Sequence, residues 1–385
     1  MPTTYTTTVT VDGYATANYG SQLDSLEIVS GATNRYELAQ PATGRASFLG
    51  LPVVSGITQT PDWWIGKKLT FTIDPDGSTG STTWVANCVG VVASVVDPAG
   101  TQQIVELELQ SPTSKLSMET IQNPILSSQW ANLYTFLNEE LQRLTWDEAP
   151  WGLTWAGATG TWATWDANKS GCTFAMSGET AGVFYSDINL SGMTVLDWLT
   201  TVFSTKKQGA IAFQDSTVTI GMNTSTTSAF TLDALTCVIA NSMSVAPSQS
   251  DVINSGKITD TSGTDYFYGN ATSVASYGYR PYDAGTSWDT LANLQSVLQK
   301  KINGFKDPNR YLASFTIDLD KVSHANTWWP SLYKMEGYPY PFTLTNVPTF
   351  MGGNHTYQVR GIQLNLTNKH AEATLVVVPS TIWNA

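Results

Sequence analysis

The residues that could do chemistry in this chain are its carboxylates, and their spacing argues against most catalytic sites. Glycoside hydrolysis needs two carboxyl groups that flank the scissile bond about 5 to 9.5 Å apart. The candidate pairs Glu139-Glu140 and Asp147-Glu148 are adjacent in sequence, so their side chains diverge and are expected to be solvated. The chain also lacks a Gly-x-Ser-x-Gly turn and a glycine-rich phosphate loop. A Ser-His-Asp triad stays open, because its members need not be close in sequence, but no catalytic residues are expected.

Histidine and cysteine, the usual side-chain ligands of zinc, are few and widely separated. They are His324, His355, His370, Cys88, Cys172 and Cys237. None of them has the spacing of a metal-ligand pair, and no Cys-x-x-Cys motif occurs. We expect buried free thiols, no metal site, no disulfide framework and no cofactor.

Exposed indole rings could bind sugars, because they present flat apolar faces on which a pyranose ring can stack. A tryptophan-dense segment contains Trp146, Trp151, Trp155, Trp162 and Trp165. Burial in a core or in a subunit contact is the favoured interpretation of that segment, because buried aromatic side chains contribute most there. Trp63-Trp64 and Trp328-Trp329 lie beside prolines in turn-rich stretches and are expected to be more exposed. The candidate interface or glycan-contact residues are Trp63, Trp64, Trp155, Trp162, Trp328 and Trp329.

The charge balance argues against a nucleic-acid-binding protein. The 385 residues include 31 acidic and 19 basic side chains, which gives a net charge of −12. Such a chain repels a phosphate backbone, so stable nucleic-acid binding is not expected. Only 13% of the residues are charged, while Thr, Ser, Gly, Trp and Tyr are plentiful, as is typical of β-rich extracellular or virion surfaces.

Targeting signals are not evident in the sequence. The first residues lack a basic region followed by an apolar stretch, so no signal peptide is expected. No apolar run approaches the ~18 residues that a membrane-spanning helix needs. We therefore expect a protein that is synthesised and folded in a cytoplasm, whatever its final location, and that has no transmembrane segment.

The elements that would position these residues fall into three blocks, of which the first covers residues 1–118. It reads as seven short strands separated by Gly, Pro or Asp-Gly turns, with a break near Gly90. The expected strands are residues 7–11, 25–29, 45–49, 68–73, 83–89, 91–96 and 103–109. Short strands at such regular spacing predict a sandwich or a small β-barrel.

The second block covers residues 119–245 and is predicted to form a mixed α/β domain that contains the tryptophan-dense segment. Apolar residues at helical spacing predict a helix over residues 128–144. A shorter helix should follow Thr194, whose spacing to Asp197 resembles a capping box. Residues 209–213 and 216–220 should form a hairpin.

The third block, residues 246–385, repeats the strand pattern of the first with one inserted helix at residues 287–303. The helix has an apolar stripe that consists of Leu291, Leu294, Leu298 and Ile302. Ser287 can cap its start and Gly304 can end it. Strands are expected at residues 313–319, 357–366 and 372–378. The sequence thus predicts a mainly β protein with inserted helices.

Several short motifs occur in an order that is similar to a known family. They are Leu23-Asp-Ser-Leu-Glu-Ile28, Gln40-Pro-Ala-Thr43, Arg45-Ala-Ser-Phe48, the Ile65-Gly66 turn and Tyr277-Gly278-x-Arg280. The strand-helix-strand after Pro281 fits the same order. In these features, which span the first and third blocks, the chain resembles the minor tail proteins of long-tailed phages that infect actinobacteria, of the tail-tip or baseplate-hub type.

The resemblance implies a structural virion protein rather than an enzyme. It implies a homotrimeric tail-tip hub whose N-terminal and C-terminal domains are similar β-barrels, so that three copies present six domains to a sixfold tail tube. Its implied partners are the distal tail protein, the tape measure protein and other tail-tip proteins, with host cell-wall glycan as a further candidate. Such a hub would close or gate the exit of the DNA. The middle block does not match the family pattern, and a hexameric distal tail protein or a carbohydrate-binding receptor protein are the alternatives.

Overall fold

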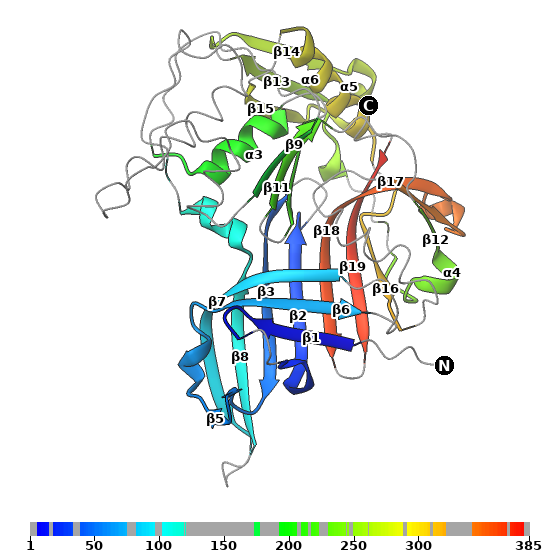
Figure 1. Ribbon diagram of the computed structural model, residues 1–385. Coiled ribbons are helices and arrows are strands. Elements are labelled where there is room, and N and C mark those ends of the chain that lie inside the picture. The colour runs from blue at the N-terminus through cyan, green and yellow to red at the C-terminus, as the bar shows by residue number, and fades with distance from the viewer. Residues whose placement is uncertain are drawn as a thin grey trace.

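One curled sheet that runs through both halves of the chain dominates the computed structural model in Figure 1. The structure describes residues 6–14, 18–33, 39–74, 82–96, 102–118, 120, 173–177, 192–205, 209–214, 217–222, 230–243, 245, 249–260, 262–287, 291–308, 311–320, 341–367 and 370–380. The expected helix at 128–144 and most of the tryptophan-dense segment lie outside these residues.

The large sheet contains eleven strands. Nine of them follow the order β1-β6-β7-β8-β3-β2-β18-β17-β12, while β19 pairs with β18 and β16 with β19. Their bounds are β1 Thr6–Val11, β2 Leu23–Gly31, β3 Gln40–Leu49, β6 Lys68–Asp74, β7 Thr82–Val95, β8 Gln103–Gln110, β12 Thr231–Asp233, β16 Ser314–Asp318, β17 Pro341–Thr345, β18 His355–Thr367 and β19 Ala371–Pro379.

The N-terminal and C-terminal blocks meet in the middle of this sheet. Strand β2 pairs antiparallel with β18 over seven residue pairs, from Gly31↔Gly361 to Ser25↔Thr367. The prediction of a mainly β protein is confirmed. The structure, however, joins strands from residues 1–118 and 246–385 in one curled half-barrel instead of two separate barrels. The block boundaries themselves stay a prediction.

Alternation of apolar and polar residues explains how the large sheet buries one face. In β8, Val105, Leu107 and Leu109 are buried while Glu106 and Glu108 are exposed. Because successive side chains of a strand point to opposite faces, all the apolar ones reach one side. They form a single core that includes Phe48, Trp84, Phe315, Phe342 and Tyr357 and so draws on both halves of the chain.

Strand β7 is longer than the sequence predicted. The expected break at Gly90 is wrong, because one strand runs from Thr82 to Val95. The ladder with β8 instead contains a bulge between Cys88 and Gly90, which absorbs one extra residue without ending the strand. The far half of β7 therefore extends beyond β6, whose pairing with β7 ends at Asn87.

A smaller sheet in the C-terminal block has the order β14-β13-β15 and is covered by a helix. Its elements are β13 Ser255–Asp260, β14 Asp265–Gly269, β15 Pro281–Ser287 and α6 Leu291–Phe305. The apolar stripe predicted for the helix is confirmed at three positions, because Leu294, Leu298 and Ile302 are buried together with Ile258 of β13. Ser287 ends β15 and is buried there, and residues 288–290, which join it to the helix, lie outside the described residues, so its role as a cap stays a prediction.

A short helix, α5 (Ala271–Tyr277), occupies the stretch before β15. Its first turn is capped by Asn270, whose Oδ1 accepts a hydrogen bond from the Ser273 amide at 3.0 Å. Gly278, at φ 75°, ends it in the backbone conformation that glycine adopts most readily.

The remaining described elements connect or flank these sheets. The three-stranded sheet β10-β11-β9 contains β9 Thr173–Ser177, β10 Gly209–Gln214 and β11 Thr217–Met222, with α3 Val195–Thr205 beside it. The smaller elements are β4 Val53–Val54, β5 Ile57–Thr58, α4 Ala234–Cys237, and the 3-10 turns Gly20–Gln22, Pro61–Trp64, Pro112–Ser117, Gln249–Asp251 and Thr349–Met351. The predicted hairpin of β10 and β11 is confirmed. The predicted cap of α3 is also confirmed, because Thr194 Oγ1 accepts a hydrogen bond from the Asp197 amide at 3.0 Å. None of the helices in the described ranges is long and apolar enough to cross a bilayer.

Candidate functional site

The face of the large sheet opposite the core carries a continuous row of polar side chains, one from each of six adjacent strands. We call it the polar row. It consists of Asp318 of β16, Glu372 of β19, Asn365 of β18, Glu27 of β2, Arg45 of β3 and Glu108 of β8. Each residue lies directly opposite the next in the strand register. The row crosses from the C-terminal to the N-terminal half without interruption.

Hydrogen bonds hold part of this row in place. Asn365 Nδ2 donates to Glu372 Oε1 at 3.2 Å, and Gln363 Nε2 donates to Glu27 Oε1 at 3.0 Å. The N-terminal part of the row, with Glu27, Arg45 and Glu108, lines an open groove across β2, β3 and β8. Because neighbouring strands are about 4.8 Å apart, side chains in one row can form a ladder along the sheet.

The polar row is acidic. It contains four carboxylates and one guanidinium, that of Arg45. Like charges brought together on one face create a negative potential that repels phosphate groups. The charge of the polar row therefore disfavours the binding of phosphate groups on this face of the sheet.

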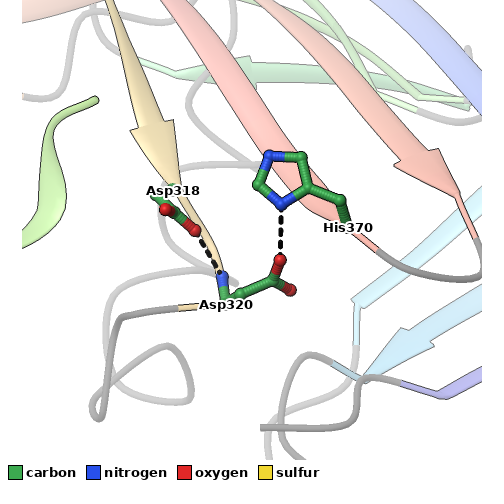
Figure 2. A group of neighbouring side chains, drawn as sticks. All are labelled: Asp318, Asp320 and His370. Carbon is green, nitrogen blue, oxygen red and sulfur yellow. Dashed lines mark hydrogen bonds and ion pairs between the residues drawn. The ribbon is translucent and has the colours of Figure 1, made fainter. Parts of the chain in front are cut away.

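The row ends at β16 in a small cluster, shown in Figure 2, of Asp318, Asp320 and His370. His370 Nδ1 lies 2.5 Å from Asp320 Oδ2, and the Asp320 amide donates to Asp318 Oδ1 at 3.1 Å. Asp320 Oδ2 also accepts from the Ala371 amide at 3.3 Å, and His370 Nε2 lies 3.6 Å from Glu372 Oε2. These contacts link the end of β16 to the turn between β18 and β19.

The carboxylates favour the charged form of the histidine. The hydrogen bond to Asp320 is the largest cause that raises the pKa of His370, and the charges of Asp320, Asp318 and Glu372 act in the same direction. Asp318 is only 6% exposed, so a positive partner offsets part of the cost of burying its carboxylate. An imidazolium held between carboxylates accounts for the geometry.

The same cluster has ligand atoms that could surround a divalent cation, because they all lie within 4.8 Å of one another. Sequence reasoning did not find this cluster. Asp320 and His370 are 50 residues apart and meet only through the pairing of β16 with β19. The sequence-based expectation that the histidines hold no metal stays a prediction.

Two of the six candidate tryptophans lie in the described residues. Trp64 is 0% exposed, so its expected exposure is wrong. The 3-10 turn Pro61–Trp64 directs its ring into the core, where it stacks on Phe48 with a centroid distance of 5.1 Å. Trp63 is partly buried, contacts the Tyr14 ring edge-on at 5.2 Å between centroids, and has Lys67 Nζ 5.4 Å from its ring centroid. Its role in an interface or glycan contact stays a prediction.

The other four candidate tryptophans, Trp155, Trp162, Trp328 and Trp329, lie outside the described residues. Of the cysteines, Cys88 and Cys237 are free and buried as predicted, while Cys172 lies outside the described part. Burial raises the pKa of each of the two described thiols to about 11, which keeps them protonated and unreactive at neutral pH.

Comparison with known proteins gives structural matches only. No family model matches the sequence, and no curated protein matches it. A tail protein from Neisseria meningitidis MC58 has 13% identity and a TM-score of 0.62, and the match covers 99% of this chain and 98% of that one. The 43 kDa tail protein of prophage MuSo2 from Shewanella oneidensis has 11% identity and a TM-score of 0.57, with 98% and 99% covered.

A third similar solved structure is a component of a secretion system. It is the E. coli c3393 protein, a type VI secretion component described as structurally similar to the T4 bacteriophage tail proteins gp27 and gp5. It has 8% identity and a TM-score of 0.50, with 96% of this chain and 76% of that chain covered. The chain therefore has a phage tail protein-like fold. None of these three source organisms is an actinobacterium, so the host implied by the sequence motifs is not supported.

Proposed function

We propose that this chain is a structural protein of a phage tail, a hub at the tail tip in which several copies surround a central channel. The observation that carries the proposal is the polar row, which runs unbroken over six strands of a curled sheet in a fold similar to tail proteins. A curled sheet with one apolar face and one acidic face is suited to form a sector of a channel wall, with its core behind it.

The acidic face would suit the wall of a channel through which DNA passes. DNA that leaves a virion must slide without being bound, and carboxylates repel its phosphates. In a trimer, the N-terminal and C-terminal parts of the sheet would supply six wall segments, which reconciles three copies with a sixfold tube. The distal tail protein and the tape measure protein are the proposed neighbours, and the virion is the proposed location.

The experiment is to determine the symmetry and mass of the purified chain by electron-microscope class averages and light scattering. A threefold ring with an open lumen supports the hub. A sixfold ring would instead support the alternative that the chain is a hexameric distal tail protein. A monomer at every concentration, together with a polar row that faces outward in virion maps, would overturn both.

A further inference from the structure

Four side chains that can bind a metal ion meet where β16 ends beside β19. Asp318 is the last residue of β16, and Asp320 follows it by two residues. His370 directly precedes β19, and Glu372 follows His370 by two residues. Asp318 lies opposite Glu372 in the antiparallel register. Because side chains two residues apart in an extended chain share one face, the four lie on the same side of the ladder. We call them the Asp-His cluster.

Main-chain hydrogen bonds position both halves of the Asp-His cluster. The Leu319 amide donates to Ala371 O at 3.0 Å, so the ladder continues past the end of β16. In the turn before β19, the Thr367 amide donates to His370 O at 2.8 Å, and the His370 amide donates to Thr367 Oγ1 at 3.0 Å. Figure 2 shows the result, in which the Asp320 and His370 side chains face each other. Backbone that is fixed in this way preorganises a metal site.

The charges within the cluster favour a divalent cation. Its three carboxylates outnumber its one imidazole, so two negative charges remain even when the imidazole is protonated. With a divalent cation and a neutral imidazole, only one negative charge remains. The difference matters at Asp318, which is only 6% exposed, because a buried carboxylate is costly unless positive charge lies beside it. A bound cation supplies that charge at a single point and is the largest local charge of such a site.

The imidazole of His370 lies between two carboxylates in the way that a metal-binding histidine does. Its Nδ1 faces Asp320 Oδ2 at 2.5 Å, while its Nε2 lies 3.6 Å from Glu372 Oε2. A histidine that binds a metal through one ring nitrogen almost always directs the other toward a carboxylate, a carbonyl or water, which fixes the tautomer and the ring. Glu372 is itself held by Asn365, whose Nδ2 donates to Glu372 Oε1 at 3.2 Å. Glu372 and Asn365 therefore have the positions of groups that orient a ligand.

The donor atoms identify the class of ion. Ca²⁺ and Mg²⁺ prefer sites made of oxygen atoms, whereas an imidazole nitrogen combined with carboxylates suits a transition metal ion such as Zn²⁺. We propose that Asp318, Asp320 and His370 bind one divalent transition metal ion, through ligand atoms that lie within 4.8 Å of one another. The ion replaces the hydrogen bond between Asp320 and His370 and joins the end of β16 to the turn before β19. This site does not depend on the hub function.

Zn²⁺ binding by the full chain, purified without a metal-binding tag and stripped of metal with EDTA that is then removed, tests the proposal. Isothermal titration at neutral pH measures the affinity and the stoichiometry for Zn²⁺ and, separately, for Ca²⁺. Asp320→Asn and His370→Gln each remove a ligand from a partly exposed position, so the fold should persist. Glu372→Gln keeps the ligands and changes the group that orients the imidazole. Asp307→Asn, at an exposed carboxylate outside the cluster, is the matched control. Circular dichroism reports the folding of each variant.

The expected result is that the wild type and Asp307→Asn bind one Zn²⁺ per chain with equal affinity. Glu372→Gln should bind it roughly 10- to 100-fold more weakly, and the two ligand variants more weakly still. Zn²⁺ should raise the melting temperature of the wild type and not that of Asp320→Asn or His370→Gln. A wild type without saturable Zn²⁺ binding, or folded ligand variants with wild-type affinity, would overturn the site. Ca²⁺ binding that is tighter than Zn²⁺ binding would overturn the assignment to a transition metal. Each of these outcomes leaves the hub proposal standing.

Discussion

Gly361 of β18 lies directly opposite Gly31 of β2, at the point where the two halves of the chain join in one sheet. A Cβ atom added at Gly361 would lie 2.0 Å from the backbone oxygen of Ala32. One added at Gly31 would lie 2.5 Å from the backbone oxygen of Arg360, and Gly31 has a φ of +77°. Both contacts are with backbone atoms, which cannot rotate away. The junction of the halves therefore depends on two residues without side chains.

The first prediction is that Gly361→Ala destabilises the protein strongly. The added methyl group must displace the backbone of Ala32, so we expect a loss of roughly 3 kcal/mol or more in the free energy of unfolding. Gly90→Ala is the control, because its Cβ would meet the flexible end of Glu108 at 3.1 Å. Urea unfolding followed by tryptophan fluorescence measures both. Equal losses for the two variants would show that the junction is not specially constrained.

The second prediction concerns the helix that covers the small sheet. Leu298 is buried between α6 and β13, and its Cδ1 lies 2.8 Å from the position of a Cβ built on Gly256. Leu298→Ala should therefore leave a cavity and cost about 2–5 kcal/mol in stability. The exposed Gln295→Ala on the same helix should change stability by less than about 0.5 kcal/mol. Thermal unfolding by calorimetry distinguishes the two variants, and similar melting temperatures would contradict the burial of Leu298 between α6 and β13.

Local patterns in the sequence predicted most individual elements. Alternation located β8 and β19, and the stripe of Leu294 and Leu298 located α6, because these signals depend only on periods of 2 and 3.6 residues. The prediction that Trp63 and Trp64 are more exposed rested on the proline and the turn beside them. A turn residue does not reveal whether a neighbouring ring packs into the core. The pairing of strands that are far apart in the sequence could not be predicted from these local patterns. Gln363 and Glu27 are 336 residues apart, and no local signal indicates that β18 and β2 are neighbours.

The third prediction tests the charge of the polar row. Replacing Glu27 and Glu108 together by Lys should make the face attract DNA, whereas the wild type should not retain it. The binding should weaken with salt, with a slope of roughly −0.9 in log affinity against log salt per phosphate contacted. Asp62→Lys with Asp307→Lys, at exposed positions outside the row, changes the net charge by the same amount. Equal DNA retention by both pairs in gel-shift assays would mean that net charge alone, and not the row, matters.

The fourth prediction concerns the pH dependence of the link between β16 and the β18-β19 turn. Because the pKa of His370 is raised in the folded state, its ion pair with Asp320 stabilises the protein fully below the pKa of the unfolded chain, and this contribution is lost as pH rises through the folded pKa. The melting temperature of His370→Gln should therefore lie furthest below that of the wild type near pH 5.5 and approach it toward pH 9. Asp320→Asn, which removes the largest cause of the shift, should flatten the dependence in the same way. Scans in EDTA-containing buffer exclude a contribution from bound cations. A gap that widens as pH rises would contradict an imidazolium at this site.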